Sequence, residues 1–389
     1  MIYLDHAAGT PVRKEVLQTM RPYFAKEFAN PSSIHETGQK ARKAVEEARE
    51  IVRKILHADT DDKIIFTSGG TESINLALQG VAHRISNCRI ITSTIEHEAV
   101  LETVRKLEKE NFPVEYVPVD EKGIVNLAAL EKILTGKILT SKNNLNSSIF
   151  ISIMYVNNEV GTIQPIKEIA QITKRHKIIF HTDACQAGYE ELNVQKLGVD
   201  LLTLNGSKIN GPKGAGILYA RKGIALEPLF YGGGQEYGLR SGTENVPAVI
   251  GFAKALELMQ KEGEKENEKG KFKLKKLRDL LTKELLKIPE SKLNGHPSEL
   301  AAHIVSVSFA GIEGEQLVRH LSEQGIYCSS GSACTSKKIA VSHVLQAMHV
   351  PEKFARGTVR FSLGKENTLQ DIKKVVEAVK EVVEVLRKV

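Results

Sequence analysis

The stretch Lys63-Ile-Ile-Phe-Thr-Ser-Gly-Gly-Thr-Glu-Ser73 contains a short apolar run, a glycine-rich turn and the start of a helical pattern. A short run rich in isoleucine and phenylalanine, bounded by glycine and serine, is typical of a buried strand. The preceding segment, Lys40–Leu56, has the apolar spacing and the acid-to-base pairs of an amphipathic helix. Helix, strand, turn and helix in this order indicate an α/β fold.

The same alternation continues towards Ala220. Helices of this length between strands indicate a mainly parallel, seven-stranded sheet, whose ligands bind at the carboxyl ends of the strands. The strands expected besides Lys63–Thr67 are Arg89–Thr92, Val114–Val117, Ile149–Val156, Lys177–His181, Leu201–Leu204 and Ala215–Ala220. The helices expected between them are Ser73–His83, His97–Glu110, Asn126–Leu134 and Ile166–His176.

Composition changes after about Leu258, where a second unit is expected. Gln260–Lys276 is a nearly continuous run of Lys and Glu, which predicts the exposed part of a long helix joining two domains. A strand at Ile304–Phe309, a helix at Glu315–Gln324 and an amphipathic helix at Asp371–Val389 then predict a smaller α+β domain. The polar stretch Ser141–Ser148 predicts an inserted surface loop.

The composition excludes several classes of protein. The chain has 389 residues, four cysteines without CxxC spacing and a net charge of +7. The cysteine spacing argues against a zinc ribbon or a disulfide framework and favours a reducing, cytoplasmic setting. The basic residues alternate with glutamate, so we expect a solvated surface and no direct contact with nucleic acid. We expect no membrane span either, because the longest apolar run, around Ile149–Val156, is too short to cross a bilayer.

Two segments at the ends of expected strands contain candidate ligand-binding groups. Ser68–Ser73 opens a helix with small residues, so its N–H groups can approach a phosphate; the alternative is a glycine-rich turn with a capped helix. Asp183 ends a buried strand, where a carboxylate needs a cationic partner such as a protonated heterocyclic nitrogen. The alternative for Asp183 is a cap of the next helix.

Two lysines and one cysteine are candidate reactive groups. Lys208 and Lys213 follow the Leu201–Leu204 strand, where an amine could form a Schiff base with an aldehyde cofactor, and spacing alone does not choose between them. Cys334 lies in a stretch of small residues, so its thiol is a candidate nucleophile. Cys88 and Cys185 fit buried, inert thiols better, and Cys328 is undecided.

The motifs taken together resemble those of the pyridoxal-phosphate-dependent cysteine desulfurases of the NifS/IscS type, which are class V aminotransferase-like enzymes of fold type I. The resemblance extends over nearly the whole chain, from Tyr3-Leu-Asp-His-Ala-Ala to Arg360-Phe-Ser-Leu-Gly. The motifs between these ends are Asn30-Pro-Ser-Ser, Phe66-Thr-Ser-Gly-Gly-Thr-Glu-Ser, Glu96-His97, Val156-Asn-Asn-Glu, His181-Thr-Asp-Ala-Cys-Gln, Gly211-Pro-Lys-Gly, Gly232-Gly-Gly-Gln-Glu, Arg240-Ser-Gly-Thr-Glu-Asn and Ser329-Ser-Gly-Ser-Ala-Cys-Thr-Ser.

The resemblance implies a role for each matching residue. Lys208 would form the Schiff base, Asp183 would pair with the pyridinium nitrogen, and His97 would stack on the ring and transfer protons. Arg360 would bind the substrate carboxylate, and Cys334 would be the nucleophile and a possible iron–sulfur ligand. The remaining cofactor contacts implied are Gly70, Thr71, Asn158, Gln186, Asn205, Ser207 and, from the partner subunit of a homodimer, Thr243; Asn158 also lies on the substrate side.

The activity implied is conversion of L-cysteine to L-alanine, with the sulfur transferred to Cys334 as a persulfide. An acceptor, either a scaffold protein for iron–sulfur clusters or a tRNA-thiolation enzyme, would then take the sulfur. The alternatives are a selenocysteine lyase, another enzyme of this fold, and a scaffold without catalysis. The implied domains are a large cofactor-binding domain at 14–258 and a small domain formed by 1–13 and 259–389, which carries the Cys334 loop.

One departure from the family pattern affects the phosphate site. The family usually has Ser-x-His-Lys where this chain has Asn205-Gly206-Ser207-Lys208. Ser207 and Asn205 can each donate a hydrogen bond, but a donor that can carry charge is lost. We therefore expect the cofactor to be retained but to dissociate more easily.

Overall fold

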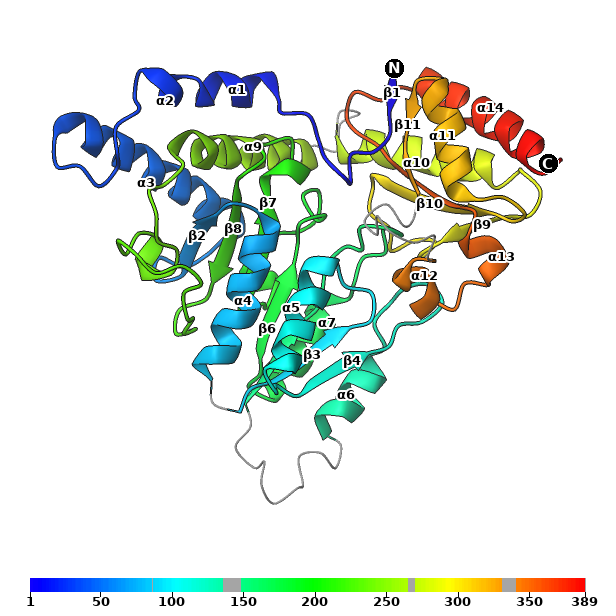
Figure 1. Ribbon diagram of the computed structural model, residues 1–389. Helices are drawn as coiled ribbons and strands as arrows, with labels where there is room; N and C mark the ends of the chain where they lie inside the picture. The colour runs from blue at the N-terminus through cyan, green and yellow to red at the C-terminus, as the bar shows by residue number, and fades with distance from the viewer. Residues whose placement is uncertain (86, 136–147, 265–269, 331–340, 389) are drawn as a thin grey trace.

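The computed structural model describes residues 1–85, 87–135, 148–264, 270–330 and 341–388. They form a large α/β unit and a smaller unit that packs beside it and contains both ends of the described chain (Figure 1). The remaining short elements are α2 (Pro22–Ala25), α12 (His343–Ala347), α13 (Glu352–Ala355) and the 3-10 turns η2 (Gly206–Lys208) and η3 (Glu236–Gly238).

A seven-stranded sheet forms the centre of the large unit. Its order is β2-β8-β7-β6-β5-β3-β4, and only β8 runs antiparallel to its two neighbours among these strands. The expected mainly parallel sheet is thereby confirmed. Its strands are β2 (Lys63–Thr67), β3 (Arg89–Ser93), β4 (Val114–Val117), β5 (Ile149–Ser152), β6 (Ile179–Asp183), β7 (Leu201–Asn205) and β8 (Gly216–Ala220).

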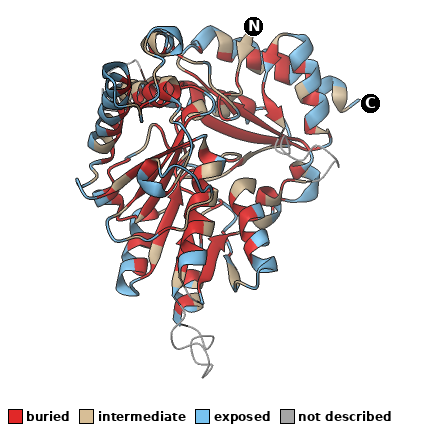
Figure 2. Cartoon of the chain, turned by 60° about the vertical axis from the view of Figure 1, so that its left-hand side comes forward, coloured by how far each residue is buried: buried red, intermediate tan, exposed pale blue. Residues whose placement is uncertain are grey.

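Side chains alternate between two apolar cores, one on each face of this sheet. In β2, for example, Ile65 belongs to one core and its neighbours Ile64 and Phe66 to the other. Both faces of the strands are therefore buried, as Figure 2 shows. One face is covered by α4 (Gly70–Arg84) and α5 (Glu98–Lys109), and the other by α1 (Lys14–Met20), α3 (Glu36–Leu56), α6 (Leu127–Thr135), α7 (Ile166–Arg175), α8 (Val194–Leu197) and α9 (Val246–Glu264).

The smaller unit is an antiparallel sheet with helices on its apolar face. Its strand order is β12-β13-β10-β9, and a separate parallel pair joins β1 to β11. Alternation along β13 buries Val359 and Phe361 in the apolar core and leaves Arg360 on the opposite, polar face. The elements are β1 (Ile2–Tyr3), β9 (Ser291–Asn294), β10 (Ile304–Phe309), β11 (Ile326–Tyr327), β12 (Ser329–Ser330), β13 (Thr358–Ser362), α10 (Lys271–Leu285), α11 (Gly314–Glu323) and α14 (Leu369–Leu386).

Two expected elements differ from the structure. The single helix expected over Gln260–Lys276 is wrong, because α9 ends at Glu264 and a separate helix, α10, begins at Lys271 after Gly270, whose φ is 140°. This φ is a conformation that glycine adopts readily and a helix interior does not allow. The expected strand Ile149–Val156 ends at Ser152. The expected loop at Ser141–Ser148 lies, apart from Ser148, outside the described residues.

Candidate active site

A cavity of about 560 Å³ opens at the carboxyl edge of the large sheet. Six of the seven strands run in one direction, so the segments after β2, β3, β5, β6 and β7 meet at this edge. The smaller unit closes the other side of the cavity. Among the residues expected in the site, the cavity brings together Gly70, Thr71, His97, Asn158, Asp183, Gln186, Asn205, Lys208 and Arg360.

Asp183 is the last residue of β6 and is only 6% exposed. Its Oδ1 accepts a hydrogen bond from the Cys185 N–H at 2.9 Å, so the carboxylate also fixes the turn that follows the strand. Below it in the sheet, His181 bridges the hydroxyls of Ser152 (2.9 Å) and Thr203 (3.0 Å). Burial lowers the pKa of His181 to about 4. This ring is therefore neutral and places no positive charge near Asp183, two residues further along β6.

The structure distinguishes the two candidate lysines. Lys208 lines the cavity, and its Nζ donates hydrogen bonds to the carbonyls of Ala7 (2.9 Å) and Ala8 (2.7 Å). Lys213 is exposed and is not part of the cavity lining. Of these two candidates, Lys208 is the one that can present an amine to a molecule bound beside Asp183.

The glycine-rich turn after β2 forms another wall of the cavity. Helix α4 begins at Gly70, and a Cβ on Gly70 would lie 2.8 Å from Cys185 Sγ, so any larger residue here would force the Cys185 side chain to move. The N–H groups at the start of such a helix have no partner within the helix and suit an anion. Asn205, also in the lining, accepts hydrogen bonds from the Ser207 N–H and hydroxyl, both at 3.3 Å.

His97 lies at the N-cap of α5 and lines the cavity. Its Nδ1 accepts a hydrogen bond from the Ala99 N–H at 3.0 Å. A neutral imidazole that accepts at Nδ1 carries its proton on Nε2. The ring therefore offers an Nε2–H group to the rest of the site.

Arg360 reaches the cavity from β13. Its Nη1 donates to the Asn158 carbonyl at 2.8 Å, its Nη2 donates to Asp5 Oδ1 at 2.9 Å, and its buried Nε has no hydrogen-bond partner among the described residues. Gln186 donates from Nε2 to the Ala7 carbonyl at 2.9 Å, the same oxygen that Lys208 contacts. The segment from Asp5 to Ala8 is therefore a wall of the site held by three of the expected residues.

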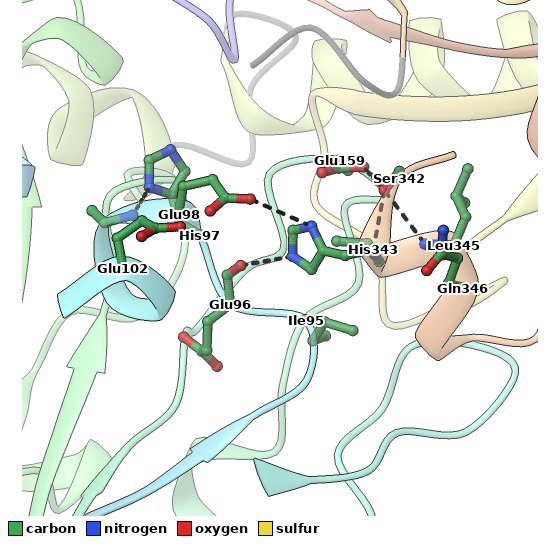
Figure 3. A network of polar contacts seen from close by, with 12 residues as sticks. Ile95, Glu96, His97, Glu98, Glu102, Glu159, Ser342, His343, Leu345 and Gln346 are labelled. Carbon is green, nitrogen blue, oxygen red and sulfur yellow. Dashed lines mark hydrogen bonds and ion pairs between the residues drawn. The ribbon is translucent and has the colours of Figure 1, made fainter. Parts of the chain in front are cut away.

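A network of acidic side chains borders the cavity where the two units meet (Figure 3). Glu96 is fully buried and accepts hydrogen bonds from the Ser93 hydroxyl and the Met154 N–H, and burial raises the pKa of its carboxyl to about 8. His343 of α12 contacts the Glu96 carbonyl at 3.0 Å and Glu98 at 3.8 Å.

Ser342, the residue before His343, donates a hydrogen bond to the Glu159 carboxylate at 2.5 Å (Figure 3), and burial raises the pKa of that carboxyl group. We did not expect Glu96, Glu159, Ser342 or His343 from the sequence. Glu96 and Glu159 belong to motifs named above, but only burial in the folded chain marks them as unusual.

Three expected residues are not part of the described cavity lining. Thr243 is exposed and lines a separate hollow with Tyr23, Phe28 and Asn30. Ser207 contacts Asn205 but is absent from the cavity lining. Cys334 lies outside the described residues.

The described thiols are poor nucleophiles. Cys88 and Cys328 are buried, and burial raises the pKa of each thiol to about 12. Cys185 lines the cavity, and burial together with the Asp183 carboxylate raises its pKa. In the described part of the chain, no cluster of His, Cys, Asp and Glu is arranged to hold a metal ion.

The sequence matches the family described as aminotransferase class-V over residues 2–375. The chain belongs to this family. Among curated relatives, it is 48% identical to the cysteine desulfurase IscS of Methanosarcina thermophila, with 99% of this chain and 93% of that protein covered. It is 46% identical to the cysteine desulfurase IscS of Dictyoglomus turgidum, with coverage of 99% and 95%. A solved NifS-like protein is 38% identical over the full length of both chains, with a TM-score of 0.88.

The class-V assignment confirms the expected family, fold type and cofactor. Enzymes of this family use pyridoxal 5′-phosphate. The cavity fits this molecule, because it combines a buried carboxylate at Asp183, an amine at Lys208 and a helix start at Gly70 that no side chain obstructs.

Proposed function

We propose that this chain is a pyridoxal-phosphate-dependent cysteine desulfurase, which converts L-cysteine to L-alanine and passes the sulfur to an acceptor. The observation that carries the proposal is the convergence of Lys208, Asp183 and Arg360 in one cavity. These side chains can bind an aldehyde, a protonated ring nitrogen and a carboxylate, respectively. The similarity to the cysteine desulfurases named above supports this substrate class.

The cofactor, when bound, supplies an electron-withdrawing ring that stabilises negative charge at the substrate's α-carbon. Asp183 would hold a proton on the ring nitrogen, because a buried carboxylate favours a neighbouring cation. Gly70 and Thr71 would bind the phosphate through the start of α4, with Asn205 and Ser207 nearby. Asn158 and Gln186 would donate hydrogen bonds near the ring's phenolic oxygen.

The substrate would be oriented by Arg360 and deprotonated by Lys208. The guanidinium is fixed at two of its nitrogens by Asp5 and Asn158, which leaves its buried Nε–H among the donors for a carboxylate. The Lys208 amine, positioned by the Ala7 and Ala8 carbonyls, would remove the proton from the substrate's α-carbon. His97 would act on the other side through its Nε2–H group.

We infer that Cys334 receives the sulfur. Its thiolate would attack the substrate sulfur, forming an S–S bond while the substrate's Cβ–S bond breaks. The electron pair would remain with that carbon, which then takes up a proton to give alanine. Supporting this choice, burial raises the pKa of Cys88, Cys185 and Cys328, so none of these thiols ionises readily.

We further propose that the protein works in the cytoplasm as a homodimer in which Thr243 contacts the phosphate of the partner subunit's cofactor. Thr243 is exposed and lies in a hollow beside Phe28, which is 75% exposed. An exposed aromatic side chain there suits a protein interface. No described helix has the length and apolar character needed to cross a membrane.

The proposed domains remain 14–258 and the combination of 1–13 with 259–389. The pairing of β1 with β11 and the presence of Leu4 in the core of the smaller unit support this division. For the sulfur, we propose iron–sulfur cluster assembly, tRNA thiolation or both as destinations, and Cys334 remains a proposed ligand of a nascent cluster.

The proposal is tested by the ultraviolet–visible spectrum of the purified protein with and without L-cysteine. We expect a cofactor band that changes on addition of L-cysteine, with formation of one alanine for each sulfur released. Selenocysteine is the matched comparison, because a selenocysteine lyase would turn it over in preference to cysteine. A protein that shows no cofactor band even after incubation with pyridoxal 5′-phosphate would overturn the proposal.

A further inference from the structure

The loop between β2 and α4 is held by an ion pair outside the proposed catalytic groups. Glu72, in the first turn of α4, accepts a hydrogen bond at Oε2 from the Ser68 N–H at 2.9 Å. Its Oε1 accepts from Arg240 Nε, also at 2.9 Å. One carboxylate therefore closes the loop from Ser68 to Glu72 and attaches it to the segment around Arg240.

The Arg240 segment is itself fixed to the same strand. Glu236 lies four residues before Arg240, and its buried carboxylate accepts two hydrogen bonds from Arg49 and one from the Phe66 N–H, all at 2.8 Å. Phe66 belongs to β2, two residues before Ser68. The guanidinium of Arg240 is thus presented to Glu72 from a segment with a rigid attachment.

The charge of Glu72 affects how well the start of α4 can bind a phosphate. The N–H groups of Gly70, Thr71 and Glu72 make no hydrogen bond to the described part of the chain, so they remain available to a phosphate. The side chain of Glu72 is only 9% exposed and is a poor neighbour for a phosphate while its charge is uncompensated. Burial by itself would raise the pKa of Glu72, but the hydrogen bonds from Arg240 and Ser68 outweigh it and lower the pKa, so the carboxylate stays charged.

We propose that Glu72 and Arg240 act together as positioning residues for the cofactor's phosphate, by fixing the Ser68–Glu72 loop while cancelling the carboxylate's charge. This inference rests on the proposed phosphate site at Gly70 and Thr71. Arg240 itself lies outside the cavity lining, so it acts through Glu72 and is not a phosphate ligand.

The test compares the affinity of the cofactor-free protein for pyridoxal 5′-phosphate with its affinity for pyridoxal, which lacks the phosphate. Glu72→Gln and Arg240→Gln should each lower the affinity for pyridoxal phosphate by about tenfold and change the affinity for pyridoxal by no more than about twofold. The double variant should be no weaker than either single variant, because both changes remove the same interaction. Arg240→Lys, which keeps the positive charge, should restore most of the preference.

Arg221→Gln is the matched control. Arg221 forms an ion pair with Asp200 and is 27% exposed in its side chain, the same fraction as Arg240. This variant should leave the ratio of the two affinities unchanged. The midpoint of thermal unfolding, measured for every variant, identifies any that fail to fold. If Arg240→Gln fails to fold, the affinities of Arg240→Lys for the two ligands are compared with those of the parent protein instead.

Thr71→Asp separates this inference from the proposed site. Thr71 is exposed at the helix start, where an aspartate is tolerated in the fold but repels a phosphate. If Thr71→Asp lowers the ratio while Glu72→Gln and Arg240→Gln do not, the positioning role is overturned and the site stands. If Thr71→Asp leaves the ratio unchanged, the site is wrong and the inference fails with it. Equal weakening of both ligands by Glu72→Gln and Arg240→Gln would also overturn the inference.

Discussion

Arg360 Nη2 and Asp5 Oδ1 lie 2.9 Å apart, although the two residues are separated by 355 positions in the chain. The contact joins β13 to the segment after β1 at the border of the cavity. It orients a guanidinium that is only 8% exposed. A planar donor fixed in this way can bind a carboxylate in one geometry.

Arg360→Lys should therefore raise the KM for L-cysteine by at least about tenfold, because an ammonium group cannot reproduce the planar set of donors. Asp5→Asn keeps an oxygen acceptor for Arg360 and should change KM by less than about threefold. Steady-state kinetics of both variants measures these effects. An unchanged KM for Arg360→Lys would exclude Arg360 as the carboxylate ligand.

Lys208→Ala should remove the absorbance band of the lysine-bound cofactor and lower activity by at least about a thousandfold, because the amine both binds the cofactor and moves the proton. Lys213→Ala is the control, since Lys213 is exposed and lies outside the cavity lining. It should keep the band and the activity. Loss of the band in Lys213→Ala alone would reverse the assignment.

Cys334→Ala should leave cofactor binding intact and stop the release of sulfur from L-cysteine, because the described thiols are held in their protonated form. Sulfide and alanine are measured together, with Cys88→Ala as the control. Sulfide production at the parent rate by the Cys334 variant would show that another group receives the sulfur.

Glu96 predicts a dependence of stability on pH. Its pKa is about 8 in the folded chain and about 4.3 in an unfolded one, so the native state binds one more proton between these values. This group therefore lowers the free energy of unfolding as pH rises through that window, by about 1.4 kcal/mol per pH unit. Glu96→Gln has no such proton. The difference between the variant's thermal midpoint and the parent's should therefore become more positive from about pH 5 to about pH 8. Parallel curves, with exposed Glu121→Gln as control, would contradict this.

Dialysis tests the departure at Asn205 and Ser207. Both hydrogen bonds from Ser207 go to Asn205 Oδ1, so little donor capacity remains for a phosphate. The cofactor band should decay during prolonged dialysis, and Asn205→Ser combined with Ser207→His should slow the decay. A parent protein that keeps its band throughout would refute the expectation of weaker binding.

The sequence predicts the large sheet well because helices separate most of its strands, and this order leaves few possible topologies. Asp183 and the pair of candidate lysines, Lys208 and Lys213, were found for the same reason, since they lie at or after the ends of two strands that meet at one edge. The break between α9 and α10 was missed, because a run of Lys and Glu is helical in pattern on either side of Gly270.

The rest of the site depends on contacts between distant segments. No local pattern reveals that the Ala7 carbonyl accepts from Lys208, or that His343 contacts the Glu96 carbonyl. The pKa of Glu96 likewise arises from burial by several elements at once. Spacing also left Lys208 and Lys213 equivalent, and only the folded chain separates an amine in a cavity from one in water.

The wall formed by Asp5 to Ala8 has a consequence for how the protein is made. Ala7 donates its N–H to the Ser362 hydroxyl, 355 positions further along the chain, and β1 pairs with β11. A ribosome must therefore release almost the entire polypeptide before this wall can assemble. The large sheet can form earlier, while synthesis continues. Vitamin B6 capture in the finished geometry is accordingly a step that follows translation.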